Sequence, residues 1–399
     1  MHRLLITGAG GPAGIALGEQ LTARSNGGAA LEWIGVDIQP LDDANFPCSA
    51  LVARADDLGY PHDMRQAIDR FRPDLVIPTV SDELPQAAVL AESLGVRSPE
   101  AERGVMISSV AATSIAADKL LTMWSLERAG VPIPRYAVAP DFADVQAALA
   151  WGEGPVVVKP RVSRGGRGVV LVEDPADLDW TSTGPGQIVQ TFAGGAEYSP
   201  QVYRSPVTGE CTVVVLQKTE LKQGRVGSAV STMRVDGPDV SDVVDVAIAA
   251  VEAVDLTGPL DLDIRRDQAG TPVVLEINAR FGANSAKAPE LLWGRAGGSG
   301  WADGLGRPVG GHHRVRGDDP GGRRDAPRPG AVRPGARRQV PSASEGRPAA
   351  GRLHLRLAAV GERHRARLQR GRRAGERLLC RRRQRLSRRG GHLRRRRVE

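Results

Sequence analysis

Lys159 lies at the end of an apolar run and just before a Gly/Arg-rich turn, a position from which its side chain could bind phosphate. The run covers 156–158 and the turn covers 161–168, after which apolar residues resume. A strand, such a turn and a returning strand can fold backbone N–H groups and cations over a polyphosphate, and the lysine adds a point charge for its oxygens. The other interpretation is a solvated hairpin turn with an incidental lysine.

A second segment, 258–280, holds carboxylates and an amide on two expected strands. Residues two apart in a strand point to the same face, so Glu276 and Asn278 project together, and Arg280 follows on that side if the strand continues. Asp263 lies on the preceding strand. Carboxylate and amide oxygens suit a Mg²⁺ ion that bridges nucleotide phosphates. The alternative is a row of outward-facing polar residues on amphipathic strands.

A third candidate lies near the N-terminus, where Gly8–Gly14 separates a strand from a helix. Glycines there permit a tight turn and let N–H groups approach an anion at the helix N-terminus. Asp37 ends the next strand, where a dinucleotide-binding fold places its ribose-binding acid. An NAD(P)-dependent oxidoreductase or epimerase therefore stays open, although the G-x-G-x-x-G pattern needs glycine at 13 and finds Ala13. The other interpretation is a glycine turn that only packs helix on sheet.

Two patterns of elements must position these residues. Over the first 110 residues, short apolar runs alternate with helical patterns, which is typical of βαβ units around a parallel sheet. We expect strands at 3–7, 31–36 and 75–78, and helices at 15–23, 64–71 and 83–94, the last stopped by Gly95. A helix over 114–129 then leads to a break at 130–134, which contains two prolines.

Beyond this break the sequence is rich in strands. We expect strands at 156–159, 169–172, 188–190, 198–203, 211–217, 227–233, 260–264 and 273–277, and a helix at 240–254. Alternation with Gly-rich turns predicts an antiparallel sheet with a few helices. The fold class is therefore α/β, with a Rossmann-like parallel-sheet domain followed by an α+β domain.

The last quarter of the sequence differs from the rest. The 399 residues carry a formal charge of +8, but the excess of basic residues lies in 293–399, which lacks Lys, Ile, Asn, Tyr, Phe, Thr and Met. Such a composition predicts disorder. Three origins of this segment stay open. The joint loss of residues with A/T-rich codons favours translation in a wrong reading frame. The others are a disordered linker and, least favoured, a tail that binds nucleic acid nonspecifically.

Cysteine usage and hydropathy limit the compartment. Cys48, Cys211 and Cys380 are isolated and odd in number, which favours a reducing cytosol over a disulfide scaffold and gives no zinc spacing. The N-terminus lacks the apolar region of a signal peptide, and no stretch approaches the length of a membrane span. We expect a cytoplasmic protein without a membrane partner.

Taken in order, these segments resemble the ATP-grasp superfamily and, within it, proteins similar to the large subunit of carbamoyl-phosphate synthase. The resemblance runs from the N-terminal domain through Phe281 and Gly282. It implies a Rossmann-like (pre-ATP-grasp) domain over 1–112, an ATP-grasp domain over 113–292 and the Arg/Gly/Pro-rich tail over 293–399. Within the ATP-grasp domain, 113–185 would hold the linker and small subdomain, and 186–292 the C-terminal subdomain.

The resemblance also implies a role for each matching residue. The phosphate lysines would be Lys119 and Lys159, the ribose-binding carboxylate Glu197, and the cation beside the transferred phosphoryl group Arg280. The Mg²⁺ ligands would be Asp263, Glu276 and Asn278. The phosphate lid would consist of Arg164, Gly165, Gly166 and Gly168, and the adenine hinge, 188–192, would include Gln190, Thr191 and Phe192.

The implied activity is that of an ATP- and Mg²⁺-dependent ligase, with Mn²⁺ as a possible substitute. A small-molecule carboxylate would become an acylphosphate that a small-molecule amine attacks, releasing ADP and phosphate. A homodimer stays open, and the tail is not expected to bind nucleic acid.

The sequence departs from the family at a few positions. Thr191 stands where many relatives have glutamate, and Pro200-Gln201 replaces the usual Val-Asp. Lys218 and Lys222 match weakly the position of a basic residue that faces the acyl substrate. Residues 288–292 begin a closing helix before the Arg/Gly segment takes over.

Overall fold

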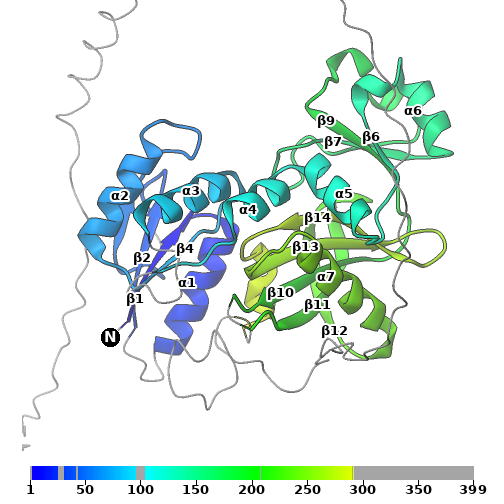
Figure 1. The fold of residues 1–399 in the computed structure, drawn as a ribbon. Coiled ribbons are helices and arrows are strands. Elements are labelled where there is room, and N and C mark those ends of the chain that lie inside the picture. The colour runs from blue at the N-terminus through cyan, green and yellow to red at the C-terminus, as the bar shows by residue number, and fades with distance from the viewer. Residues whose placement is uncertain are drawn as a thin grey trace, which may run out of the picture. The chain divides into compact units, whose positions relative to one another are not determined.

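The N-terminal sheet has five parallel strands in the order β3-β2-β1-β4-β5 (Figure 1). These strands are β1 (His2–Thr7), β2 (Leu31–Asp37), β3 (Ser49–Leu51), β4 (Leu75–Ile77) and β5 (Gly104–Val105). The computed structural model describes residues 2–25, 31–41, 44–95, 104–206, 208–289 and 291. The predicted parallel-sheet domain is confirmed, and the short strands β3 and β5 were not predicted.

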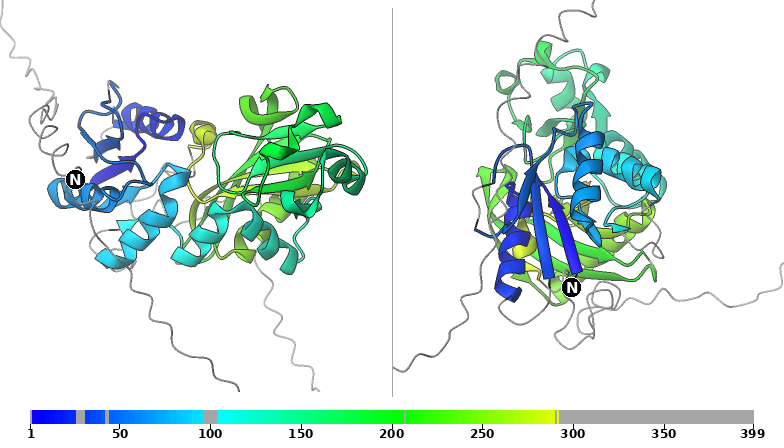
Figure 2. Two further views of the ribbon diagram at one scale, coloured as in Figure 1. Left: turned by 90° about the horizontal axis from the view of Figure 1, so that it is seen from above. Right: turned by 90° about the vertical axis from the view of Figure 1, so that its left-hand side faces the viewer.

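Helices cover both faces of this sheet. Leu17 and Leu21 of α1 (Pro12–Ser25) pack on one face, and Met64 and Ile68 of α2 (Tyr60–Phe71) on the other, with α3 (Leu84–Leu94) beside α2. Figure 2 shows α1 and the lighter-blue helices on opposite sides of the blue strands. The first helix begins at Pro12 and not at Ile15 as expected, because the first helical turn tolerates a residue without an N–H group.

The single helix expected over 114–129 is wrong. The chain forms α4 (Val110–Ala117) and α5 (Lys119–Arg128), which are separated by Asp118 in an extended conformation. The Asp118 carboxylate accepts the N–H of Leu120 at 2.9 Å and pairs with Arg161, so it caps α5. This break makes Lys119 the first residue of a helix, where its side chain can turn toward the sheets.

A four-stranded sheet follows, in the order β6-β9-β7-β8, with neighbouring strands antiparallel. Its strands are β6 (Tyr136–Val138), β7 (Val156–Pro160), β8 (Val170–Val172) and β9 (Gln187–Thr191). The strands expected at 156–159, 169–172 and 188–190 are confirmed here, while β6 and α6 (Val145–Gly152), the latter capped by Asp144, were not predicted. Strand β9 pairs within this sheet, although it was expected in the C-terminal subdomain that begins at 186.

The largest sheet has five antiparallel strands in the order β12-β11-β10-β13-β14. Its strands are β10 (Glu197–Arg204), β11 (Cys211–Gln223), β12 (Val226–Val235), β13 (Gly258–Arg266) and β14 (Pro272–Asn278). Helix α7 (Ser241–Ala253) packs on one face, where apolar residues of β10, β11, β13 and β14 form the largest core (Figure 1). The predicted antiparallel α+β domain is confirmed, with strands β11 and β12 longer than expected.

The segment after β14 joins the two cores. Phe281 is 3% exposed and packs with Leu4, Ile6 and Trp33 of the N-terminal sheet. Ala288 and Leu291 pack on Val214 and Leu216 of β11, on the opposite face of the large sheet from α7. The rest of the expected closing helix and the tail over 293–399 lie outside the described residues. Within the described ranges, no helix is long and apolar enough to cross a membrane.

Candidate active site

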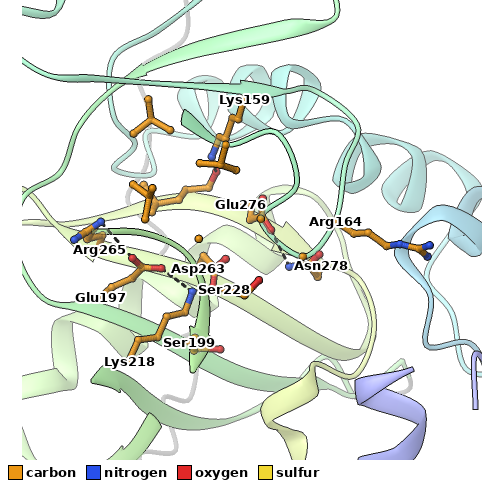
Figure 3. A pocket seen from close by; sticks show the side chains of 18 of the residues that line it. Lys159, Arg164, Glu197, Ser199, Lys218, Ser228, Asp263, Arg265, Glu276 and Asn278 are labelled. Carbon is orange, nitrogen blue, oxygen red and sulfur yellow. Dashed lines mark hydrogen bonds and ion pairs between the residues drawn. The ribbon is translucent and has the colours of Figure 1, made fainter. Parts of the chain in front are cut away.

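A pocket lies between the small sheet and the polar face of the large sheet, and its side chains come from strands far apart in the sequence (Figure 3). Every candidate site residue lines this pocket except Lys119 and Gly168. The residues that the structure brings together are Lys159, Arg164, Gly165, Gly166, Gln190, Thr191, Phe192, Glu197, Asp263, Glu276, Asn278 and Arg280. Lys119 lies in a smaller neighbouring cavity that shares Glu276 and Asn278.

The Lys159 ammonium points across the pocket to a backbone irregularity in β14. Asp263 pairs with Glu276 but Ile264 pairs with Val274, so Leu275 is an extra residue in the ladder. Such a bulge redirects its own peptide groups, and Lys159 Nζ donates to the Leu275 carbonyl at 3.2 Å. Burial, partly offset by nearby Glu276, lowers the pKa of Lys159 to about 8.

Glu276 is bound by a second lysine. Lys119 Nζ lies 3.2 Å from Glu276 Oε2 and donates to the Ser163 carbonyl at 3.2 Å. Asn278 Nδ2 donates to Glu276 Oε1 at 3.3 Å. Burial alone would raise the pKa of Glu276, but the positive charges of Lys119 and Lys159 outweigh it and lower that pKa to about 2. Glu276 is therefore a carboxylate at neutral pH.

A row of alternating charges crosses the large sheet at the pocket floor. Lys218 of β11 and Arg265 of β13 are the cross-strand neighbours of Glu197 on β10. Lys218 Nζ lies 2.6 Å from both Glu197 Oε1 and Asp263 Oδ1, and Arg265 Nη1 lies 3.3 Å from Glu197 Oε2. Burial raises the pKa of Asp263. Burial alone would lower the pKa of Lys218, but the nearby carboxylates of Asp263 and Glu197 outweigh it and raise that pKa.

A hydrogen-bonded network surrounds Arg280. The strand ends at Asn278, before Arg280, yet Arg280 still turns into the pocket because Nη1 lies 3.2 Å from Asp261 Oδ2. Asp261 Oδ1 accepts hydrogen bonds from Ser199 Oγ at 2.8 Å and Gln201 Nε2 at 2.6 Å. Arg280 Nε also donates to the Ser81 hydroxyl of the N-terminal domain at 3.1 Å. Gln201, where a departure from the family was expected, thus helps to hold Asp261.

The Gly-rich turn between β7 and β8 contacts neighbouring elements. Gly165, Gly166 and Gly168 all have positive φ, between +63° and +71°, which favours glycine. A side chain at Gly166 would meet the backbone of Ser228 on β12 at 3.1 Å. Arg164 pairs with Asp82 at 3.0 Å, and Figure 3 shows its guanidinium directed away from Lys159 and Glu276.

The expected adenine hinge runs along one wall of the pocket. Gln190 is buried and donates to Met123 Sδ at 3.2 Å. The N–H groups of Thr191 and Phe192 donate to the carbonyls of Arg135 and Pro155, at 3.0 Å each. Two guanidinium groups lie over the Phe192 ring, with Arg225 at 4.6 Å and Arg265 at 4.7 Å from its centroid.

The glycine loop near the N-terminus is occupied by its own protein groups. The N–H groups of Ala9 and Gly11 donate to the carbonyls of Val36 and Gly8, and that of Gly10 donates to Asp37 Oδ2 at 2.8 Å. A side chain at Gly14 would lie 2.4 Å from the Gly8 carbonyl oxygen. These contacts favour the interpretation as a turn that packs α1 on the sheet.

Sequence reasoning missed several participants in the site, among them Arg265, Asp261 and Asp82. Arg265 lies two residues from Asp263 on one strand, so the strand period alone could have found it. Asp261 could have been found in the same way. Asp82 could not, because it is 82 residues from Arg164 along the chain and carries no motif. Among the described residues, no group of three or more His, Cys, Asp or Glu side chains is arranged to hold a metal.

Comparisons with known proteins agree with this architecture. Residues 116–284 match the family model of the ATP-grasp domain. The chain is 32% identical over 207 residues to a D-alanine–D-alanine ligase of Gloeobacter violaceus, covering 46% of this chain and 65% of the ligase. The chain therefore spans less than two thirds of that relative.

Solved structures share the fold at low identity. An L-amino acid ligase from Bacillus licheniformis aligns with a TM-score of 0.54 at 18% identity, over 73% of this chain and 70% of that one. An N5-carboxyaminoimidazole synthetase from Staphylococcus aureus, solved with ADP, gives a TM-score of 0.54 at 17% identity over 70% of each chain. None of these comparisons singles out the carbamoyl-phosphate synthase branch, which stays a prediction.

Proposed function

Residues 116–284 form an ATP-grasp domain, and from that premise we propose that the protein is an ATP- and Mg²⁺-dependent carboxylate–amine ligase. It converts a small-molecule carboxylate into an acylphosphate, which a small-molecule amine attacks to give an amide-type product, ADP and phosphate. The observation that carries the proposal is the convergence of Lys159, Arg280 and the pair Glu276/Asn278 on one pocket. The similarity to a D-alanine–D-alanine ligase and to an L-amino acid ligase supports the proposal.

The donor set fits a divalent cation. Asp263 and Glu276 are directly paired on adjacent strands, and Asn278 follows Glu276 on the same face. Two carboxylates and an amide oxygen are hard ligands for Mg²⁺, which in phosphoryl-transfer sites takes its other ligands from water and phosphate. When bound, the ion neutralises phosphate charge and orients the transferred group.

The chain's own residues supply the remaining charge. Lys159 and Lys119 would bind phosphate oxygens, and Glu197 the ribose hydroxyls. Arg280, held by Asp261 and Ser81, would stabilise negative charge on the phosphoryl group and on the carboxylate that attacks it. Because phosphoryl transfer depends mainly on positioning and electrostatics, a rigid network around Arg280 is what the reaction needs.

The direct test is ADP release by the purified full chain with ATP, Mg²⁺ and a panel of carboxylates paired with amines. A productive pair should release ADP in proportion to amide product. ATP binding without ADP release from any pair would contradict the ligase. A melting comparison of ATP·Mg²⁺ with NADH tests the oxidoreductase alternative, since a ligand that binds only the folded state raises its stability.

Two substitutions separate binding from turnover. Lys159→Ala should weaken ATP binding about ten- to hundredfold, because it removes a charge-assisted hydrogen bond. Glu276→Gln should leave ATP binding nearly intact and lower metal-dependent turnover about a hundredfold. Isothermal titration and ADP release measure the two effects. Arg128→Ala, at an exposed position in the last turn of α5, is the control, and wild-type behaviour of both site variants would contradict the assignment.

A further inference from the structure

Both carboxylates of the proposed metal set are bound by lysine ammonium groups. Lys119 Nζ lies 3.2 Å from Glu276 Oε2, and Lys218 Nζ lies 2.6 Å from Asp263 Oδ1. An ammonium group on a carboxylate supplies the positive charge that a cation would otherwise supply at the same oxygens. A metal that binds Asp263 must therefore displace, or share oxygens with, Lys218.

The two lysines differ in what else they can bind. Lys119 is a proposed phosphate ligand, so the arriving nucleotide gives it a new partner and frees Glu276. Lys218 has no such exchange: its side chain is 5% exposed and lies between two carboxylates of the pocket floor (Figure 3). When Lys218 leaves Asp263, Glu197 at 2.6 Å remains its partner.

Glu197 does not depend on Lys218 for its charge balance. Its other oxygen lies 3.3 Å from Arg265. Among the described residues, Lys218 is the only side chain that forms an ion pair with Asp263, although the charge of Lys159 also acts on Asp263. Loss of the Lys218 charge would therefore leave Asp263 without its ion-pair partner, and a divalent cation at the same oxygens would take that partner's place.

We propose that Lys218 is a positioning residue that acts as a built-in counter-ion: it neutralises Asp263 until the divalent cation arrives and opposes metal binding in the absence of nucleotide. The inference rests on the proposed function, because it takes Asp263 as a metal ligand. Metal and nucleotide then enter together, and Lys218 moves from a bridge between two carboxylates to a single pair with Glu197. This role differs from that of a lysine that faces the acyl substrate, because the ammonium group of such a lysine would point toward the substrate carboxylate.

The test uses Mn²⁺ alone, counted by the loss of the free-ion electron paramagnetic resonance signal with the full chain. Lys218→Met and Lys218→Gln remove the charge, and each should bind Mn²⁺ at least about tenfold tighter than wild type. Lys218→Arg keeps the charge and should bind like wild type. Lys222→Met, on the same strand but exposed, should change nothing.

Equal Mn²⁺ affinity of the neutral variants and wild type would overturn the proposal, as would tighter binding by Lys222→Met. A purely structural role for Lys218 would lower the melting temperature without tightening Mn²⁺ binding, and this too overturns it. If both neutral variants fail to fold, the Mn²⁺ affinity of the wild-type protein is the test. A dissociation constant for Mn²⁺ alone below about 0.1 mM contradicts the counter-ion role of Lys218, and a larger dissociation constant supports it. Since ATP is absent throughout, failure here leaves the ADP-release test of the ligase untouched.

Discussion

Glu83 organises the loop that carries Ser81 and Asp82 to the site. Its Oε1 accepts the N–H groups of Thr79 at 3.2 Å and Val80 at 3.0 Å, and also the Thr7 hydroxyl. Its Oε2 accepts the Tyr60 hydroxyl at 3.0 Å. Burial raises the pKa of Glu83 above its ordinary 4.5, although the four donors oppose that change.

This arrangement predicts a pH dependence of stability. As pH rises above 4.5, the unfolded chain releases a proton that the folded chain keeps, so stability falls until the folded pKa is passed. Glu83→Gln retains the acceptor for the two N–H groups and can donate to the Tyr60 oxygen, so it should remove this fall. Urea unfolding from pH 4.5 to 8 measures it, and wild type gaining on the variant as pH rises would contradict the sign.

Glu83→Ala serves as the companion variant. It leaves the buried N–H groups of Thr79 and Val80 without their acceptor, which should destabilise the protein by about 1–3 kcal/mol for each orphaned donor. A cost near zero would mean that the loop finds other acceptors.

At the scale of residues, the strand period was the most informative signal. It placed Glu276 and Asn278 on one face, and the register confirms that Asp263 lies opposite Glu276. It did not reveal that Lys218 lies between Glu197 and Asp263, because the position of a long side chain depends on which strands are neighbours. Sheet order is a property of the whole fold, and no local pattern contains it.

The Gly-rich turn between β7 and β8 is an element whose position is set by contacts outside it. Arg164 pairs with Asp82, and both side chains are partly exposed, at 28% and 38%. A pair of this kind contributes little to stability, but it competes with any role of Arg164 at the phosphates. This weak ion pair therefore directs the Arg164 guanidinium away from Lys159 and Glu276.

Asp82→Asn should remove this ion pair. We expect ATP·Mg²⁺ to bind about two- to fivefold tighter, which corresponds to the typical strength of an exposed ion pair. Isothermal titration measures it, with Asp69→Asn as the control, since Asp69 pairs with Arg65 at 2.7 Å elsewhere on the surface. Weaker ATP binding by Asp82→Asn would mean instead that Asp82 supports the nucleotide-bound turn.

Most elements could be predicted because their signals are local. Gly95 ends α3 with a φ of +64°, as its type and place suggested. The break at Asp118 was missed, because the cap depends on Arg161, which comes from another segment. The sheet to which β9 belongs was not predicted, because its partners β6 and β7 precede it in the sequence.

For the whole molecule, one side chain joins the strand that carries the site to the N-terminal core. Phe281 is 3% exposed among Leu17, Trp33 and Phe46. Phe281→Ala should lower the free energy of unfolding by about 3–5 kcal/mol, the usual cost of such a cavity. Urea unfolding measures it, and Val230→Ala, at a position 55% exposed on β12, should change it by less than about 0.5 kcal/mol.

A small effect of Phe281→Ala would mean that the N-terminal core is complete without it. The domain order was predictable from motif order, but this contact was not. An apolar residue after a motif gives no sign of which of two cores will receive it.

The position of Phe281 has a consequence during synthesis on the ribosome. The strands and helices that surround it end by residue 95 or earlier, whereas residue 281 is added much later. At translation rates of about 5–20 residues per second, the delay is roughly 10–40 s. Throughout that interval the nascent N-terminal domain lacks the Phe281 side chain, so we expect its core to be completed only when the last motif of the site emerges.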